Sequence, residues 1–308
     1  MILFWVLVFI VSLAVLLKGS DWLLNAAEKL GLVLGLSPFI IGVTIISIGT
    51  SFPELISSLF AVLKQAPEIV TANAVGSNIA NTFLILGLAA ILGKGLRVTK
   101  DLIDLDLPLL ALSTVLFLGV AVDGKITFIE ALLLLIGYGV YFAYNILQKD
   151  ISAPKKKRGS FQTSDIVFLI LGIAGVALGA RFLIDSVLAL SGLLGIATGV
   201  ISILAIAIGT SLPELFVSVK AAMQKKPEIA LGNVFGSNVF NILVVVGLPG
   251  IFGVLPIAPS TLAIGLPVLA VATLLFIVSG ISKRIHAWEG FFYLLLYVLF
   301  SAKVLDLF

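Results

Sequence analysis

The sequence predicts an all-α polytopic membrane protein with ten transmembrane helices in two inverted five-helix repeats. The 308 residues are 60% hydrophobic and only 11% charged, whereas a soluble domain is about 25% charged. Apolar runs of about 20 residues, long enough to cross a bilayer as helices, recur from end to end. A stretch of the first half is also repeated in the second. The chain has no cysteine, which excludes disulfides and thiolate metal sites.

The apolar runs divide the chain into ten expected helices. Within lipid, each segment must satisfy its own backbone polar groups, so a helix is the expected form of every run. The segments are 2–24, 39–63, 68–92, 103–122, 127–147, 165–190, 198–223, 228–252, 259–281 and 286–305.

The repeat relates the two halves without a gap. Residues 49–88 align with 209–248 at a constant offset of 160, with 18 identities in 40 positions. Each half holds five expected helices, an odd number, so the second half must enter the membrane from the opposite side. Inverted repeats of this kind are common in secondary transporters. We therefore expect a first repeat at 1–147, a linker at 148–164 and a second repeat at 165–308.

Lysine and arginine are unevenly distributed between the two sides of the predicted membrane. The side that holds the 148–164 linker carries 13 of them and the other side 3. The positive-inside rule places the richer side in the cytoplasm. We expect a cell-membrane protein with this linker cytoplasmic and both termini outside, and the placement of charge gives no reason to expect nucleic acid as a partner.

Two similar motifs, SIGTSFPEL at 47–55 and AIGTSLPEL at 207–215, each place a glutamate after a proline within an apolar run. Glu54 falls near the middle of segment 39–63, where a carboxylate is costly and marks a functional site. Pro53 lacks an N–H and its ring blocks the Gly49 carbonyl, so we expect the helix to kink or open there. The freed backbone oxygens and the carboxylate would then lie about one turn apart.

Further polar residues accompany each glutamate on two helical faces. Ser47, Thr50, Ser51 and Glu54 share one face by their spacing. The next helix carries the stripe Asn73, Ser77 and Asn81, and the second copy supplies Thr210, Ser211, Glu214, Asn233, Ser237 and Asn241. Asn78 and Asn238 lie off this stripe, so that interhelical bonding and membership of the site are equal alternatives for them.

The donor set is made of oxygens alone, which suits Ca²⁺ and Na⁺. Two carboxylates in a medium of low dielectric need a cation or a proton to be stable. A carrier built on them should therefore not cross the membrane empty, and this indicates an exchanger.

The paired motifs GTSxPEL and GNVFGSN–FN, the latter with its first copy ANAVGSN–AN, closely resemble the two repeats of the calcium/cation antiporter superfamily. The likeness is best to the sodium/calcium exchanger branch and its prokaryotic relatives, and it covers essentially the whole chain. The resemblance implies exchange of Ca²⁺ for Na⁺ by alternating access, with the first and sixth helices sliding across a fixed core. It implies no cofactor, since both ions are bound as transported substrates, and we expect a monomer in the lipid bilayer.

By the same resemblance, Glu54 and Glu214 match the central carboxylates shared by the two ions. Asn81 and Asn241 match the polar pair beside them, and Thr50 and Thr210 match ligands through backbone or hydroxyl oxygen. The outer Na⁺ ligands correspond to Ser51, Ser77, Ser211 and Ser237, and the carbonyl donors to Ser47 and Ala207. Position 241 is Asn where some relatives, including the potassium-dependent branch, carry Asp, which weakens the case for K⁺ co-transport.

Three alternatives fit the residues less well. An H⁺/Ca²⁺ (or other divalent cation) exchanger on the same fold comes second, because that branch typically carries a Glu that GNVFGSN lacks. An intramembrane hydrolase would need a general base near Ser51 or Ser211, and the single histidine, His286, lies at a helix start. A cation channel would conduct without a counter-ion. We therefore expect a transporter and not an enzyme.

Overall fold

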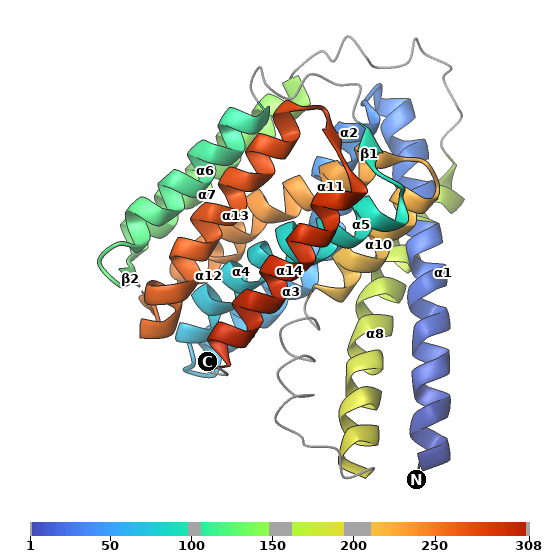
Figure 1. Ribbon diagram of the computed structural model, residues 1–308, viewed down its shortest axis with the longest axis horizontal. Helices are drawn as coiled ribbons and strands as arrows, with labels where there is room; N and C mark the ends of the chain where they lie inside the picture. The colour runs from blue at the N-terminus through green and yellow to red at the C-terminus, as the bar shows by residue number, and fades with distance from the viewer. Residues whose placement is uncertain (1, 98–105, 148–161, 194–210, 306–308) are drawn as a thin grey trace.

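Long apolar helices make up almost all of the chain in the computed structural model, which describes residues 2–97, 106–147, 162–193 and 211–305. Figure 1 shows their arrangement. Eight of the helices in the described residues are long and apolar enough to cross a membrane, and a ninth apolar helix is shorter. The fold class predicted from the sequence is confirmed to this extent.

The elements of the first half follow the predicted segments closely. They are α1 (Ile2–Leu34), α2 (Pro38–Ile41), the π-helical turn η1 (Gly42–Ile46), α3 (Ser47–Leu63), α4 (Glu68–Ile79), the π-turn η2 (Ala80–Ile85), α5 (Leu86–Leu92), β1 (Leu96–Arg97), α6 (Asp106–Ala121), β2 (Lys125–Ile126) and α7 (Phe128–Leu147).

The second half has a similar order of elements where it is described, with an additional π-turn, η4, before α13. They are α8 (Thr163–Leu193), α10 (Leu212–Met223), α11 (Pro227–Phe240), the π-turn η3 (Asn241–Val245), α12 (Gly247–Gly250), β3 (Leu255–Pro256), the π-turn η4 (Thr261–Gly265), α13 (Leu266–Ile281), β4 (Arg284–Ile285) and α14 (Ala287–Val304). Of the expected helix 198–223, residues 198–210 lie outside the described residues.

Two short antiparallel ladders join the halves. In one, β1 pairs with β4, with Leu96 opposite Ile285 and Arg97 opposite Arg284. In the other, β2 pairs with β3, with Lys125 opposite Pro256 and Ile126 opposite Leu255. Each ladder ties a turn of the first half to a turn of the second.

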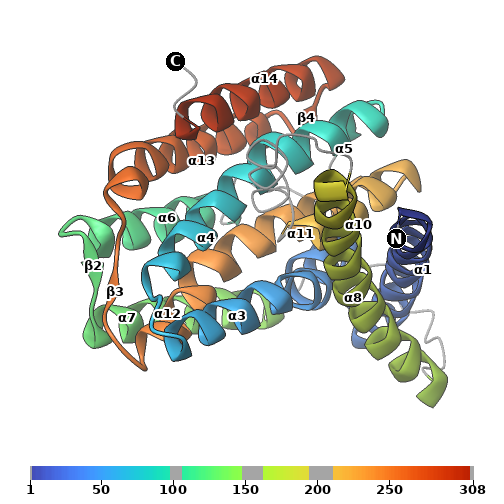
Figure 2. The same cartoon turned by 90° about the horizontal axis from the view of Figure 1, so that it is seen from below.

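The helices α1 and α8 form a closely packed pair beside the other helices (Figures 1 and 2). Glycines bring their backbones together: a Cβ on Gly172 would lie 2.5 Å from the Leu23 nitrogen, and one on Gly179 would lie 2.8 Å from the Leu16 nitrogen. Small residues of this kind let membrane helices approach closely. We call α1 and α8 together the helix pair.

The helix α11 lies at the centre of the remaining helices (Figure 2). Every residue from Ile229 to Phe240 is buried, and its glycines allow two other segments to touch its backbone. A Cβ on Gly42 would lie 2.6 Å from the Ile229 carbonyl oxygen, and one on Gly236 would collide with the Val43 carbonyl oxygen. This close approach sets the position of α11 against η1 and α3, where the predicted site lies.

Two expectations about helix shape are corrected. The first helix continues to Leu34, well beyond the predicted end at residue 24, because its charged residues Asp21, Glu28 and Lys29 pair with residues of other segments. The second helix does not open at Pro53, which lies inside the continuous helix α3. The irregular turn is instead η1, which ends one residue before Ser47.

Candidate functional site

The two glutamates of the repeated motif are brought together in the interior. Glu54 on α3 and Glu214 on α10 are each only 1% exposed. Ser51 connects the two helices, because its hydroxyl donates to Glu214 Oε1 at 2.7 Å. The same hydroxyl oxygen lies 2.9 Å from Ser237 Oγ on α11. Residues far apart in the chain thus meet at one point, as the sequence predicts.

A second chain of hydrogen bonds holds α3 against α11. Thr50 Oγ1 donates to Asn233 Oδ1 at 3.2 Å, and Asn233 Nδ2 donates to Ser218 Oγ on α10 at 2.9 Å. The Thr50 hydroxyl also lies 3.3 Å from the Ser47 carbonyl oxygen. Asn233 is fully buried and was left out of the predicted ligand set, although the polar stripe on its helix could have revealed it.

Several buried polar atoms at this centre have no hydrogen-bond partner among the described residues. They are both carboxylate oxygens of Glu54, Oε2 of Glu214, the hydroxyl of Ser211, and both side-chain amide atoms of Asn81 and Asn241. An unpaired buried charge is strongly unfavourable, and buried polar groups are normally paired. A cluster of unpartnered oxygens around two carboxylates is the arrangement expected of a site that binds dehydrated cations.

The backbone is irregular where the two asparagines lie. Asn81 is the second residue of the π-turn η2, and Asn241 is the first residue of the π-turn η3. Such single turns inside α-helices are frequent at functional sites. With η1 ending just before Ser47, three π-turns adjoin the site, a feature that no sequence motif predicted.

The remaining predicted residues divide into three groups. Ser77 and Ser237 are buried on α4 and α11. Asn78 and Asn238 form interhelical bonds: Asn78 Nδ2 donates to the Asn238 carbonyl at 2.8 Å, and Asn238 Nδ2 donates to Thr82 Oγ1 at 3.0 Å. Thr210 and Ala207 lie outside the described residues.

Comparison with known proteins assigns the fold to a family. The family model described as sodium/calcium exchanger protein matches residues 4–147 and 164–305. The chain belongs to the sodium/calcium exchanger family. Exchangers of this family are transporters and not enzymes, so the hydrolase alternative is excluded, and Na⁺ and Ca²⁺ are the transported substrates.

Individual proteins match along most or nearly all of the chain. The sodium/calcium exchanger MaX1 of Methanosarcina acetivorans is 35% identical over 96% of both chains. The inner membrane protein YrbG of Escherichia coli is 35% identical over 79% of this chain and 78% of its own. The structure of the sodium-calcium exchanger NCX_Mj soaked with zero Na⁺ and Ca²⁺ superposes with a TM-score of 0.87 at 32% identity, covering 99% of this chain and 100% of that one.

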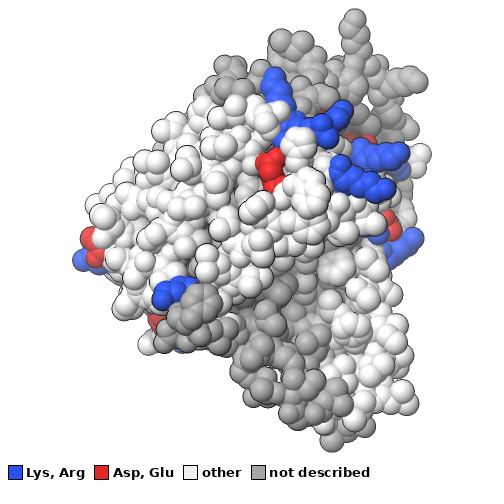
Figure 3. Space-filling view, in the orientation of Figure 1, with Lys and Arg blue, Asp and Glu red and all other residues white. Residues whose placement is uncertain are grey.

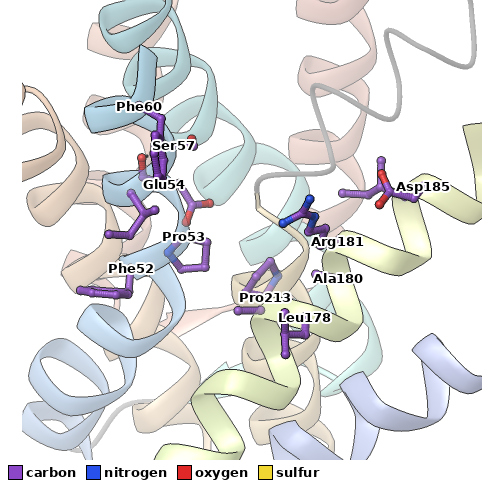
Figure 4. A pocket seen from close by; sticks show the side chains of 13 residues that line it. Phe52, Pro53, Glu54, Ser57, Phe60, Leu178, Ala180, Arg181, Asp185 and Pro213 are labelled. Carbon is purple, nitrogen blue, oxygen red and sulfur yellow. Dashed lines mark hydrogen bonds between the residues drawn. The ribbon is translucent and has the colours of Figure 1, made fainter. Parts of the chain in front are cut away.

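The exchanger also contains a cavity of about 600 Å³ between α3 and α8, with Glu54 in its wall. Figure 4 shows Glu54 on one side and Arg181 and Asp185 of α8 on the other. Arg181 and Asp185 are both exposed. The cavity thus extends from these two charged side chains to Glu54 at the centre of the site.

Proposed function

We propose that this exchanger moves Ca²⁺ against Na⁺ by alternating access through one shared site at mid-membrane depth. The proposed ligands are Glu54, Glu214, Thr50, Thr210, Ser51, Ser211, Ser77, Ser237, Asn81, Asn241, Ser47 and Ala207. The observation that carries the proposal is the cluster of buried carboxylate and amide oxygens that lack hydrogen-bond partners among the described residues. Oxygen donors alone favour these two ions over softer metals.

The charge of the site explains why transport is an exchange. Two carboxylates carry a charge of −2, which one Ca²⁺ balances and a few Na⁺ balance in large part. When no cation is bound, like charges in a low dielectric repel one another and are poorly solvated. The loaded carrier therefore crosses between its two states more easily than the empty one, so that each ion returns only in exchange for the other.

The proposed architecture has ten transmembrane helices in two inverted repeats, 1–147 and 165–308, joined by a cytoplasmic linker at 148–164. Both termini are outside, as the distribution of basic residues favours. The cavity between α3 and α8 then opens to the outside. The helix pair moves relative to the other helices to close this cavity and to open the opposite side, and a single chain suffices for transport.

The test is uptake of radiolabelled Ca²⁺ into proteoliposomes that contain the purified protein. One set of vesicles is loaded with Na⁺ and a matched set with K⁺ or choline, each with and without a pH gradient. The proposal expects uptake only from Na⁺-loaded vesicles, collapsing when the Na⁺ gradient is dissipated by an ionophore. Vesicles without protein correct for leak.

Three results would contradict the proposal. Uptake driven by the pH gradient alone would assign the site to H⁺/Ca²⁺ exchange. Uptake that persists in the absence of any counter-ion gradient would indicate a channel. Equal rates from Na⁺-loaded and K⁺-loaded vesicles would likewise remove the role of Na⁺.

A further inference from the structure

A second cavity, of about 350 Å³, is lined by four basic side chains: Lys94, Arg97, Lys225 and Arg284. We call it the basic pocket. Its other lining residues are Gly93, Gly95, Ala222 and Pro227, so none of the described residues that line it is acidic. Lysine and arginine side chains gather over this end of the molecule, at the upper right of Figure 3, where β1, α5 and α10 are labelled in Figure 1.

The ladder between β1 and β4 places two of these charges face to face. Arg97 is directly opposite Arg284 in the register of the two strands. Like charges opposite one another on neighbouring strands destabilise a ladder, and this ladder is only two residues long on each side. An anion between the two guanidinium groups would turn that repulsion into attraction.

Other basic residues at this end of the molecule are neutralised by carboxylates. Lys29 pairs with Asp165 at 2.8 Å and Lys226 pairs with Glu28 at 2.6 Å. The four residues of the basic pocket form no such pair within the described part of the chain, and all four are exposed. Four cations without a carboxylate partner among the described residues are thus gathered in one concave place.

The chemistry of the pocket matches a phosphate group. Arginine binds phosphate oxygens through two parallel N–H groups, and lysine adds a compact positive charge. Two arginines and two lysines around one cavity can therefore bind a phosphate group more firmly than they bind a single carboxylate group.

The surroundings of the pocket match a lipid. It lies where the apolar helices α5, α10 and α13 end and α14 begins. Exposed apolar side chains flank it, including Leu92 at 49%, Ile281 at 51% and Trp288 at 78% exposure. Tryptophan is enriched at the level of lipid headgroups, and basic pockets between helix ends bind anionic headgroups.

We propose that the basic pocket binds the phosphate of an anionic phospholipid headgroup, with the acyl chains lying against the neighbouring apolar residues. The membrane orientation given under the proposed function places this lipid in the cytoplasmic leaflet, and that placement rests on the proposed function. Lipid binding itself does not depend on ion exchange. Bound lipid connects turns of both halves, because Lys94 and Arg97 belong to the first and Lys225 and Arg284 to the second.

The test measures the thermal unfolding midpoint of the purified full-length protein in nanodiscs as phosphatidylcholine is replaced by phosphatidylglycerol. A ligand that binds the folded state raises this midpoint with its concentration. The variant Arg97→Gln/Arg284→Gln is compared with Lys64→Gln/Lys125→Gln, which removes the same charge at the other end of the helices. A further arm adds inorganic phosphate to nanodiscs of pure phosphatidylcholine.

Relative to the wild type, the double arginine variant should lose stabilisation in phosphatidylglycerol but not in phosphatidylcholine. Each basic contact near a membrane contributes about fivefold in binding, so the double arginine variant should bind phosphatidylglycerol about 25-fold more weakly. In pure phosphatidylcholine the same variant should be at least as stable as the wild type, because the Arg97–Arg284 repulsion is gone. The lysine variant should respond to phosphatidylglycerol like the wild type.

Three results would overturn the assignment. Equal responses of the two double variants would mean that only overall charge matters. An equal unfolding midpoint of the wild type in both lipids would exclude binding of the anionic lipid. Full stabilisation by inorganic phosphate alone would assign the pocket to a soluble phosphate. Because none of these measurements uses transport, a failure of the proposed function would leave them unaffected.

Discussion

Removing one ion pair should shift the exchanger away from the state seen in the structure. Lys220 Nζ lies 2.8 Å from Asp21 Oδ2 and also donates to the Leu17 carbonyl at 2.8 Å. These contacts fasten α1, one member of the helix pair, to α10. If the helix pair moves relative to the other helices during transport, the contacts must break, so Lys220→Gln should favour the opposite state.

The size of the effect follows from the exposure of the pair. The side chains of Lys220 and Asp21 are 23% and 33% exposed, and a partly exposed ion pair contributes about 1 kcal/mol or less. The hydrogen bond to the Leu17 carbonyl adds about 0.5–1.5 kcal/mol. A loss of ~1–2 kcal/mol changes the ratio of the two states by a factor of about 5–30.

The absence of native cysteine makes the shift measurable. Ser57 lines the cavity between α3 and α8, so Ser57→Cys should react with a membrane-impermeant thiol reagent while the cavity is open. Adding Lys220→Gln should slow this reaction in proportion to the lost fraction of open molecules, which approaches the full shift of about 5–30-fold where the open state is the minor one. The charge-exchanged variant Asp21→Lys/Lys220→Asp should restore the rate in part, because the ion pair returns but the hydrogen bond to the Leu17 carbonyl does not.

A matched control lies within the helix pair. Lys29 of α1 pairs with Asp165 of α8 at 2.8 Å, and if both helices move together, as proposed, this pair stays intact. Lys29→Gln should therefore leave the labelling rate of Ser57→Cys unchanged. An unchanged rate with Lys220→Gln, or an equal loss with Lys29→Gln, would refute the idea that the contacts between α1 and α10 hold this state.

Four other substitutions test the site and its support. Glu54→Gln and Glu214→Gln should each abolish Ca²⁺ exchange, although both variants should still fold. In the absence of cations, each should raise the thermal unfolding midpoint, because a buried charge is lost. Retained exchange in both variants would refute the site. Asn238→Ala should lower the free energy of unfolding by about 1–3 kcal/mol, since it leaves the buried Thr82 hydroxyl of η2 without the amide that pairs with it, as denaturant titration would measure. Gly236→Ala should cost about 1–3 kcal/mol through its collision with Val43, and an unchanged unfolding midpoint would contradict that packing.

The position of the site could be predicted because it depends on depth and repetition. The length of an apolar run fixes which residues lie near its middle, and the repeat shows which polar residues are paired between the halves. Glu214, Ser51 and Ser237 accordingly meet as expected, and Glu54 is buried on the same helix as Ser51. The proline was misread as an opening of the helix, because a helix can continue past a proline when neighbouring groups satisfy the freed backbone.

Other features depend on properties that a single sequence does not display. A π-turn inserts one residue into a helix without a characteristic composition, so η1, η2 and η3 were not predicted. The basic pocket depends on the register of two-residue strands, which sets Arg97 opposite Arg284. Such short strands have no alternation pattern from which their register could be derived.

The repeat predicts equal surroundings for the two halves, yet the charged residues outside the repeated motifs differ. At the offset of 160, Asp21 corresponds to Arg181 and Lys220 to Phe60. Asp21 and Lys220 form an ion pair between α1 and α10. Their counterparts, Arg181 and Phe60, both line the cavity between α8 and α3. If the opposite state were the mirror of this one, Arg181 would approach an aromatic ring, a weaker contact when exposed than an ion pair reinforced by a backbone hydrogen bond. The proposed ion ligands are therefore nearly symmetric, whereas the contacts that hold each state are not. Substitutions at these four positions should thus change which side is open without altering the proposed ligands.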